Sequence, residues 1–236
     1  MTSATTKSAF WNGLRDGLPF IFVVVPFATL FGVVALDAGL TLAQTIGFTV
    51  LVIAGAAQFA AVQLMLDNAA IGFVLLAALA VNLRMAMYSA ALVPYLGSAP
   101  IWQRALISYL NFDQSYVTSI AKYEAEPDMS VPNRVSYFLG VSTAIAPLWV
   151  VATIVGALIG KAIPDALALD FILPIAFLSL VAPMLRSVAH VAAAMVSVIV
   201  SLLLISLPSG SGLLVAAFCA MVAGVVVETW MEGRSA

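Results

Sequence analysis

Two charged side chains lie inside predicted membrane-spanning stretches of this sequence. Arg84 stands in the run VNLRMAMY, and Asp113 stands in YLNFDQSY. A charge at the centre of a membrane helix costs about 2.5–3.5 kcal/mol on insertion scales, so such residues usually mark function. We expect Arg84 to hold a carboxylate through its forked guanidinium, and Asp113 to bind an ammonium group or carry a coupling proton. The competing interpretation is a structural ion pair between two helices, or an arginine that snorkels to the interface.

Amide side chains accompany both charges. Asn82 precedes Arg84 by two positions, and Asn111 and Gln114 flank Asp113. These amides are candidates for hydrogen bonds to a polar ligand. Residues two positions apart lie on different faces of a regular helix, so Asn82 and Arg84 reach one site only if the helix is unwound between them.

A further amide, Gln58, follows small residues in the segment GAAQF at residues 55–59. Small residues allow close approach of helices, or they accompany a local break that frees backbone groups for a polar ligand. Plain packing, with Gln58 making an interhelical hydrogen bond, is the alternative. The predicted substrate-binding set is therefore Gln58, Asn82, Arg84, Asn111 and Gln114, with Asp113 for proton coupling.

The composition indicates a membrane protein. Of 236 residues, 64% are hydrophobic and only 8% are charged, whereas soluble domains carry about 25% charged residues. The net charge of -2 gives no basic footprint for nucleic acid. The sequence contains one cysteine, Cys219, and one histidine, His190. These counts argue against an intramolecular disulfide and against a metal cluster. We expect a chain surrounded by lipid, with no cofactor, no metal and no enzymatic activity.

The apolar runs predict seven or eight membrane-spanning helices, since a span needs about 20 apolar residues. We therefore expect an all-α fold, a polytopic membrane helix bundle that forms one transporter domain over residues 1–236. The fourth stretch is the most polar, and if it does not cross, seven spans remain and the second half reverses. The predicted spans are 18–36, 42–66, 69–96, 101–123, 135–159, 166–185, 188–207 and 212–230.

Lysine and arginine residues predict the orientation. Eight spans with an internal N-terminus place six of these residues on the cytoplasmic side and two outside. This bias favours a cytoplasmic N-terminus. The inner residues are Lys7, Arg15, Lys122, Arg134, Arg186 and Arg234, and the outer ones are Arg104 and Lys161.

A polar loop at 124–133 divides the chain into two candidate halves, 8–123 and 134–232. Ala-Thr at 28–29 and Gly32 recur 124 positions later as Ala-Thr at 152–153 and Gly156. Chance recurrence of common residues is the alternative. Related halves with broken or kinked helices are frequent in transporters, where the site lies between the repeats. Whether such repeats are parallel or inverted depends on the number of spans.

Several of these segments together resemble the AzlC family over about residues 8–232. They are GLRDGLP at 13–19, GAAQF at 55–59, NLR at 82–84 followed by Tyr88, and the element around Asp113. That family comprises the large subunits of bacterial branched-chain amino acid exporters. Two positions depart from its pattern, because Gln114 replaces a frequent second acid and Met85 replaces a frequent histidine.

The resemblance implies a secondary carrier in the bacterial cytoplasmic membrane. Such a carrier exports valine, leucine, isoleucine or analogues together with a small, separately encoded AzlD-type subunit, and the complex can assemble further into a homo-oligomer. A non-transporting scaffold or regulatory subunit is one alternative, and a carrier for another small amino acid or organic solute is the other. The sequence leaves the amino acid and the coupling ion open.

Overall fold

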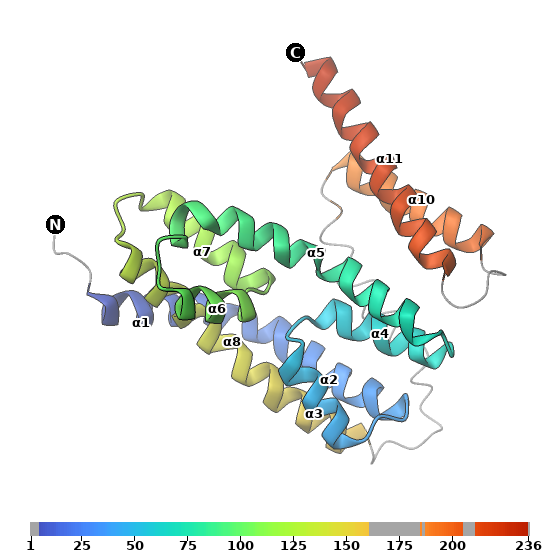
Figure 1. The fold of residues 1–236 in the computed structure, drawn as a ribbon, viewed down its shortest axis with the longest axis horizontal. Helices are drawn as coiled ribbons and strands as arrows, with labels where there is room; N and C mark the ends of the chain where they lie inside the picture. The colour runs from blue at the N-terminus through green and yellow to red at the C-terminus, as the bar shows by residue number, and fades with distance from the viewer. Residues whose placement is uncertain (1–4, 161–184, 186, 205–210, 236) are drawn as a thin grey trace. The chain divides into compact units, whose positions relative to one another are not determined.

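The computed structural model describes residues 5–160, 185, 187–204 and 211–235, and every element in this described part is a helix (Figure 1). The predicted all-α membrane bundle is confirmed. The chain forms two compact units, Met1–Phe59 with Ala78–Ile163, and Ala60–Ala77 with Pro164–Ala236.

Three helices of the described part are long and apolar enough to cross a bilayer. The first joins α1 (Thr6–Gly17), η1 (Leu18–Phe20) and α2 (Ile21–Asp37) into a 32-residue rod. The others are α5 (Ile71–Leu96), with 26 residues, and α8 (Val131–Gly160), with 30. They match the first, third and fifth predicted spans.

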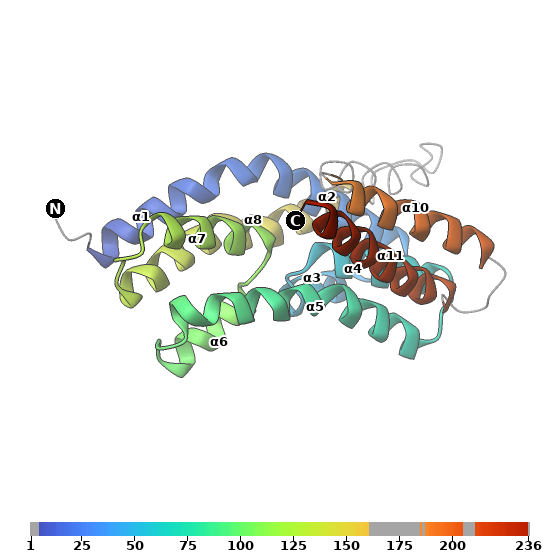
Figure 2. The ribbon, with the colours of Figure 1, turned by 90° about the horizontal axis from the view of Figure 1, so that it is seen from above.

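The rod formed by α1 and α2 packs along α8 through glycines (Figures 1 and 2). A Cβ atom on Gly32 would overlap the carbonyl oxygen of Thr153, and one on Gly156 would overlap that of Thr29. Nearer the start of both helices, Gly13 meets Tyr137 in the same way. Moving along the rod from Gly13 to Gly32, the contact partner on α8 moves from Tyr137 to Thr153. The rod and α8 therefore run in the same direction. The two recurring motifs contact each other on helices of the same direction, an arrangement compatible with parallel repeats, although the duplication itself stays a prediction.

Residues 42–66, predicted as one span, form two short helices instead. Helix α3 (Leu42–Leu51) has 10 residues and α4 (Gly55–Leu66) has 12, lengths of about 15–18 Å that cannot cross a core of about 30 Å. Phe48 of α3 and Phe59 of α4 both lie against Phe31, at centroid distances of 6.0 and 5.4 Å. The chain therefore turns back at 52–54, so the predicted break is present but the continuous span is wrong.

The fourth predicted span is a second hairpin, formed by α6 (Ile101–Tyr109) and α7 (Asp113–Ala125). Tyr88 stacks on Tyr116 at 4.2 Å, and seven residues later Tyr95 lies 5.5 Å from Tyr123. Helix α7 thus runs parallel to α5, and α6 must lead the chain back from the end of α5. A single crossing over 101–123 is wrong, because neither half-helix is long enough to span.

The second unit contains the helix pair α10 (Val188–Leu203) and α11 (Ser211–Ser235). Ser187 caps α10 by accepting the His190 amide N–H at 3.2 Å. The pair corresponds to the last two predicted spans. The predicted span 166–185 lies outside the described residues except for Leu185.

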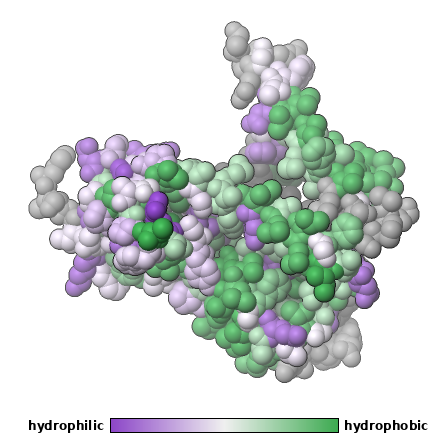
Figure 3. All heavy atoms as spheres, viewed as in Figure 1, coloured by the Kyte–Doolittle hydropathy of each residue, from purple (hydrophilic) through white to green (hydrophobic). Residues whose placement is uncertain are grey.

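The surface of the described helices is apolar over much of its area. Large exposed side chains include Phe22, Leu83 and Met87 in the first unit, as expected for contact with lipid. In Figure 3, hydrophilic residues gather at the end of the first unit that carries α1 and α7. This distribution is typical of a membrane protein with one polar end exposed to water.

Candidate functional site

Arg84 and Asp113, the two charges found in apolar sequence, form an ion pair. Arg84 Nη1 lies 3.2 Å from Asp113 Oδ2, and the Tyr88 hydroxyl donates to Asp113 Oδ1 over 3.0 Å. Arg84 and Tyr88 are one turn apart on α5, so they present one face to the carboxylate. The two charged side chains are 28% and 39% exposed, so a ligand can reach the pair. The Arg84 Nε atom is buried without a hydrogen-bond partner.

The start of α7 fixes Asp113 as the first residue of that helix. The Ser115 hydroxyl oxygen accepts the Phe112 amide N–H at 3.0 Å and lies 2.8 Å from the carbonyl oxygens of Leu110 and Phe112, one of which takes its proton. The positive end of the helix dipole favours a carboxylate at this position. Tyr116, one turn on, stacks on Tyr88 with an interplanar angle of 7°. The geometry therefore holds Asp113 and Tyr88 as a unit.

The turn between α6 and α7 places Asn111 beside this pair. Asn111 is 3% exposed and donates through Nδ2 to Ser89 Oγ at 3.1 Å, whereas its Oδ1 has no partner. Ser89 follows Tyr88 directly, so the hairpin turn lies level with the last third of α5. Buried polar oxygens without partners are rare, and they require a specific explanation.

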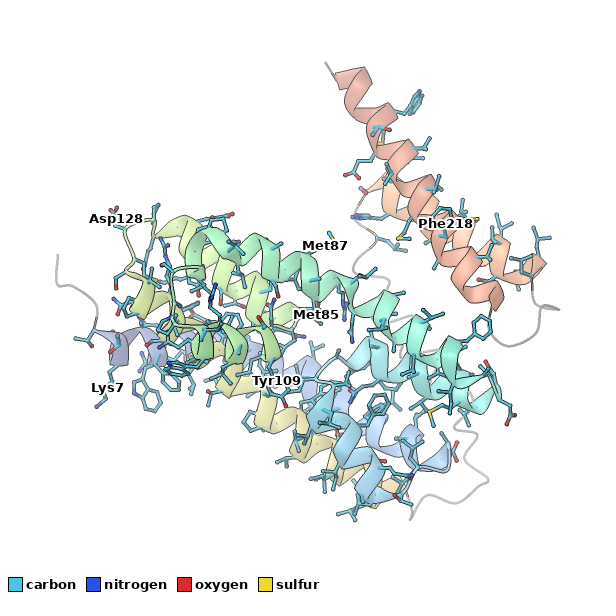
Figure 4. All side chains as sticks on the ribbon, in the orientation of Figure 1. Lys7, Met85, Met87, Tyr109, Asp128 and Phe218 are labelled. Atoms are coloured by element: carbon cyan, nitrogen blue, oxygen red, sulfur yellow. The ribbon has the colours of Figure 1, made fainter. Side chains whose placement is uncertain are left out.

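The turns of the two hairpins are linked to each other. The Tyr109 hydroxyl, at the end of α6, donates to the carbonyl oxygen of Val50, one residue before the end of α3. The last carbonyl groups of a helix lack partners within it, so this bond serves one of them. In Figure 4, Tyr109 lies near the meeting point of the two hairpins.

Gln58 lies fully buried in the first hairpin, just beyond its turn. Its Nε2 donates to Thr49 Oγ1 over 3.4 Å, and its Oε1 has no partner. The amide therefore bridges α3 and α4. The predicted helix break and the predicted interhelical hydrogen bond are both present, whereas a ligand at the break stays a prediction.

The remaining predicted residues, Asn82 and Gln114, lie on the same two helices as the pair. Helix α5 is continuous through Asn82 and Arg84, so the unwinding that would let both reach one site is absent. Asn82 keeps a buried Oδ1 without a partner, and Gln114 is half-buried in the first turn of α7. Met85, next to Arg84, packs against the core, whereas Met87 points away from it (Figure 4).

Sequence reasoning missed the roles of Tyr88, Ser89, Thr49 and Tyr109. Tyr88 had an available signal, since its spacing of four from Arg84 puts both on one helix face. The partners of Tyr109 and Thr49 follow from contacts between hairpin arms, which no periodicity reveals.

Known proteins match this chain over most of its length. The AzlC protein family matches residues 19–163, which include α2, both hairpins, α5 and α8. The chain belongs to the AzlC family. It is also 25% identical over 240 residues to the inner membrane protein YgaZ of Escherichia coli (strain K12), covering 96% of this chain and 94% of that relative. No solved structure matches it. Family membership and the apolar helices together support a role in membrane transport.

Proposed function

We propose that this chain is the large subunit of a secondary carrier that exports branched-chain amino acids, working with a small AzlD-type subunit. Membership of the AzlC family supports it, and so does the similarity to an inner membrane protein. The observation that carries the proposal is the reachable Arg84–Asp113 pair at the turn of a helical hairpin. Ionisable residues within membrane helices usually belong to substrate or ion pathways.

The pair is complementary to the main chain of an amino acid. A substrate carboxylate replaces Asp113 at the Arg84 guanidinium, whose Nε is already without a partner, and a substrate ammonium group replaces Arg84 at the Asp113 carboxylate. Between turnovers the two side chains compensate each other, which avoids an unpaired charge. The unpartnered Asn111 Oδ1 adds an acceptor nearby.

Proton coupling follows from the same carboxylate. A proton on Asp113 removes the negative partner of the substrate ammonium group, so proton and amino acid compete for one residue. Competition of this kind is what an antiporter needs, because inward movement of protons then drives outward movement of the amino acid. When the Asp113 carboxylate binds the substrate ammonium group, it also loses its contacts with the Arg84 and Tyr88 donors.

The hairpins strengthen the predicted orientation. The hairpin of α6 and α7 enters and leaves at the end of α5. Arg104 on α6, which eight spans would place outside, therefore lies on the same side as the N-terminus. The connections at 38–41 and 67–70, at the opposite ends of α2 and α5, contain no lysine or arginine. By the positive-inside rule, this distribution supports a cytoplasmic N-terminus. The basic residues on that side are Lys7, Arg15, Arg104, Lys122 and Arg134.

The test is efflux of preloaded radiolabelled valine, leucine and isoleucine from cells that express the chain with its small partner. We expect efflux above that of empty cells, and its loss in Asp113→Asn at equal membrane abundance. Absence of efflux with both subunits in the membrane would contradict the branched-chain assignment.

The second candidate function, a scaffold subunit, is favoured by the way the same pair joins α5 to α7. In that case Asp113→Asn lowers the yield of the assembled complex, while the transport rate per assembled complex stays that of wild type. Normalising efflux to the amount of complex separates the two functions.

A further inference from the structure

The turn between α3 and α4 brings the buried polar side chains of Thr49 and Gln58 next to the carbonyl end of α3, whose last residue, Leu51, is exposed. Helix α3 ends at Leu51, and its last four carbonyl groups have no partners within the helix. The Val52 amide N–H serves the Phe48 carbonyl, and the Tyr109 hydroxyl serves that of Val50. The carbonyl groups of Thr49 and Leu51 remain at the negative end of the α3 dipole.

Gln58 gives an independent sign of a ligand at this turn. The side chain is 0% exposed, and so is that of Thr49, to which its Nε2 is bonded. That bond fixes the amide across the end of α3, with Oε1 buried and unpartnered. A buried acceptor without a partner destabilises the fold, because the oxygen has lost its hydrogen bonds to water and gained none in return. A bound group that satisfies this oxygen therefore offsets the cost.

The atoms at this turn are ligands for a cation of single charge. An amide oxygen, a hydroxyl oxygen and helix-end carbonyl oxygens carry partial negative charge but no full charge. Calcium and magnesium usually require carboxylates, and no acidic side chain occurs between Leu42 and Leu66. Carbonyl ends of discontinuous helices coordinate sodium or protons in other carrier folds.

We infer that the α3–α4 turn is a binding site for a monovalent cation, held by Gln58 Oε1, Thr49 Oγ1 and the carbonyl end of α3. Two sources share this chemistry, namely a free sodium ion and the primary ammonium group of the transported amino acid, which in that case binds here in place of Asp113. The site is distinct from Asp113, and a sodium ion here would be a coupling ion in addition to the proton. Only the ammonium source rests on the proposed function.

The experiment measures equilibrium binding to the full chain, purified with its partner subunit in lipid nanodiscs. Radiolabelled sodium is titrated into wild type, Gln58→Leu and the matched control Gln63→Leu, a glutamine on the same helix that contacts Asp67. For a sodium site, wild type and Gln63→Leu bind saturably, and Gln58→Leu binds about tenfold more weakly. Thr49→Val, which removes one ligand oxygen at similar shape, is the second variant if Gln58→Leu does not fold.

A second arm identifies the ammonium source. Radiolabelled leucine is bound, and isoamylamine, which keeps the ammonium group but lacks the carboxylate, is the competitor. For an ammonium site, isoamylamine displaces leucine from wild type and Gln63→Leu, and about tenfold more is needed with Gln58→Leu or Thr49→Val. If neither sodium nor the amine binds in a manner sensitive to these variants, the inference is overturned. If Asp113→Asn still binds sodium, the cation site is independent of the transport mechanism proposed for Asp113.

Discussion

At the residue scale, Asp113 accepts from two donors that lie on successive turns of α5. Arg84 engages one carboxylate oxygen and Tyr88 engages the other. Hydrogen bonds to charged groups contribute about 1.5–3 kcal/mol, roughly twice the value between neutral groups. Tyr88 therefore determines where the carboxylate rests, although it carries no charge itself.

Removal of the Tyr88 hydroxyl should impair transport without harming the fold. Tyr88→Phe loses the bond to Asp113 but keeps the stack on Tyr116. We expect initial leucine efflux to fall about tenfold, with unchanged membrane abundance. Tyr116→Phe is the matched control, because it keeps the stack and the Asp113 bond, and its efflux should stay within about twofold of wild type. Equal losses in both variants would show that the Tyr88 bond has no special role.

The charged residues could be predicted from the sequence, whereas their geometry could not. Arg84 and Asp113 stand out because a charge in an apolar stretch is costly. Asn82 shows that residue type alone does not fix which side chains reach one ligand. Its predicted contact with the ligand of Arg84 required an unwound α5, and the helix is continuous. Asn111 was a candidate by type alone, and its partner Ser89 depends on where the hairpin turns.

At the element scale, the contact between α2 and α8 depends on two glycines. Gly32→Ala places a methyl group into the carbonyl of Thr153. Overpacking of this kind costs about 1–3 kcal/mol, so we expect lower thermal stability of the purified protein. Gly47→Ala in α3 is the control, because a Cβ there meets nothing within 4 Å, and replacing a helix glycine stabilises by about 0.5–1 kcal/mol. Equal melting temperatures for the two variants would contradict this packing.

The hairpins show why spans are hard to predict from hydropathy. Residues 42–66 have the length and apolar character of one span, yet they form helices of 10 and 12 residues. Two half-helices and one full helix have the same composition, so a window average cannot distinguish them. The GAAQF segment did indicate the break. Only the contacts of Phe48 and Phe59 with one ring, that of Phe31, show that the chain turns back.

At the scale of the whole molecule, the second hairpin makes a prediction about topology. If α6 and α7 enter and leave at the same end, the connections at 97–100 and 126–130 face the same compartment. A single crossing over 101–123 would put them on opposite sides. The two arrangements differ in the compartment of every loop that follows.

Cysteine labelling tests this arrangement. In a Cys219→Ala background, we expect Ser98→Cys and Asp128→Cys to react with a membrane-impermeant thiol reagent only from the cytoplasmic side. Asn68→Cys, in the connection at the other end of α5, should react only from outside. Labelling of Ser98→Cys and Asp128→Cys from opposite sides would restore the single crossing.

The most direct test of the central claim uses the purified complex in proteoliposomes. An imposed proton gradient should drive leucine movement in wild type. Asp113→Asn should lose this drive but keep a slower leucine–leucine exchange, because the carboxamide can accept from an ammonium group but cannot take up a proton. Lys122→Gln, which removes the separate ion pair between Lys122 of α7 and Glu126, the residue after that helix, should behave as wild type. Gradient-driven transport that persists in Asp113→Asn would contradict the proposed coupling, and so would an equal loss in Lys122→Gln.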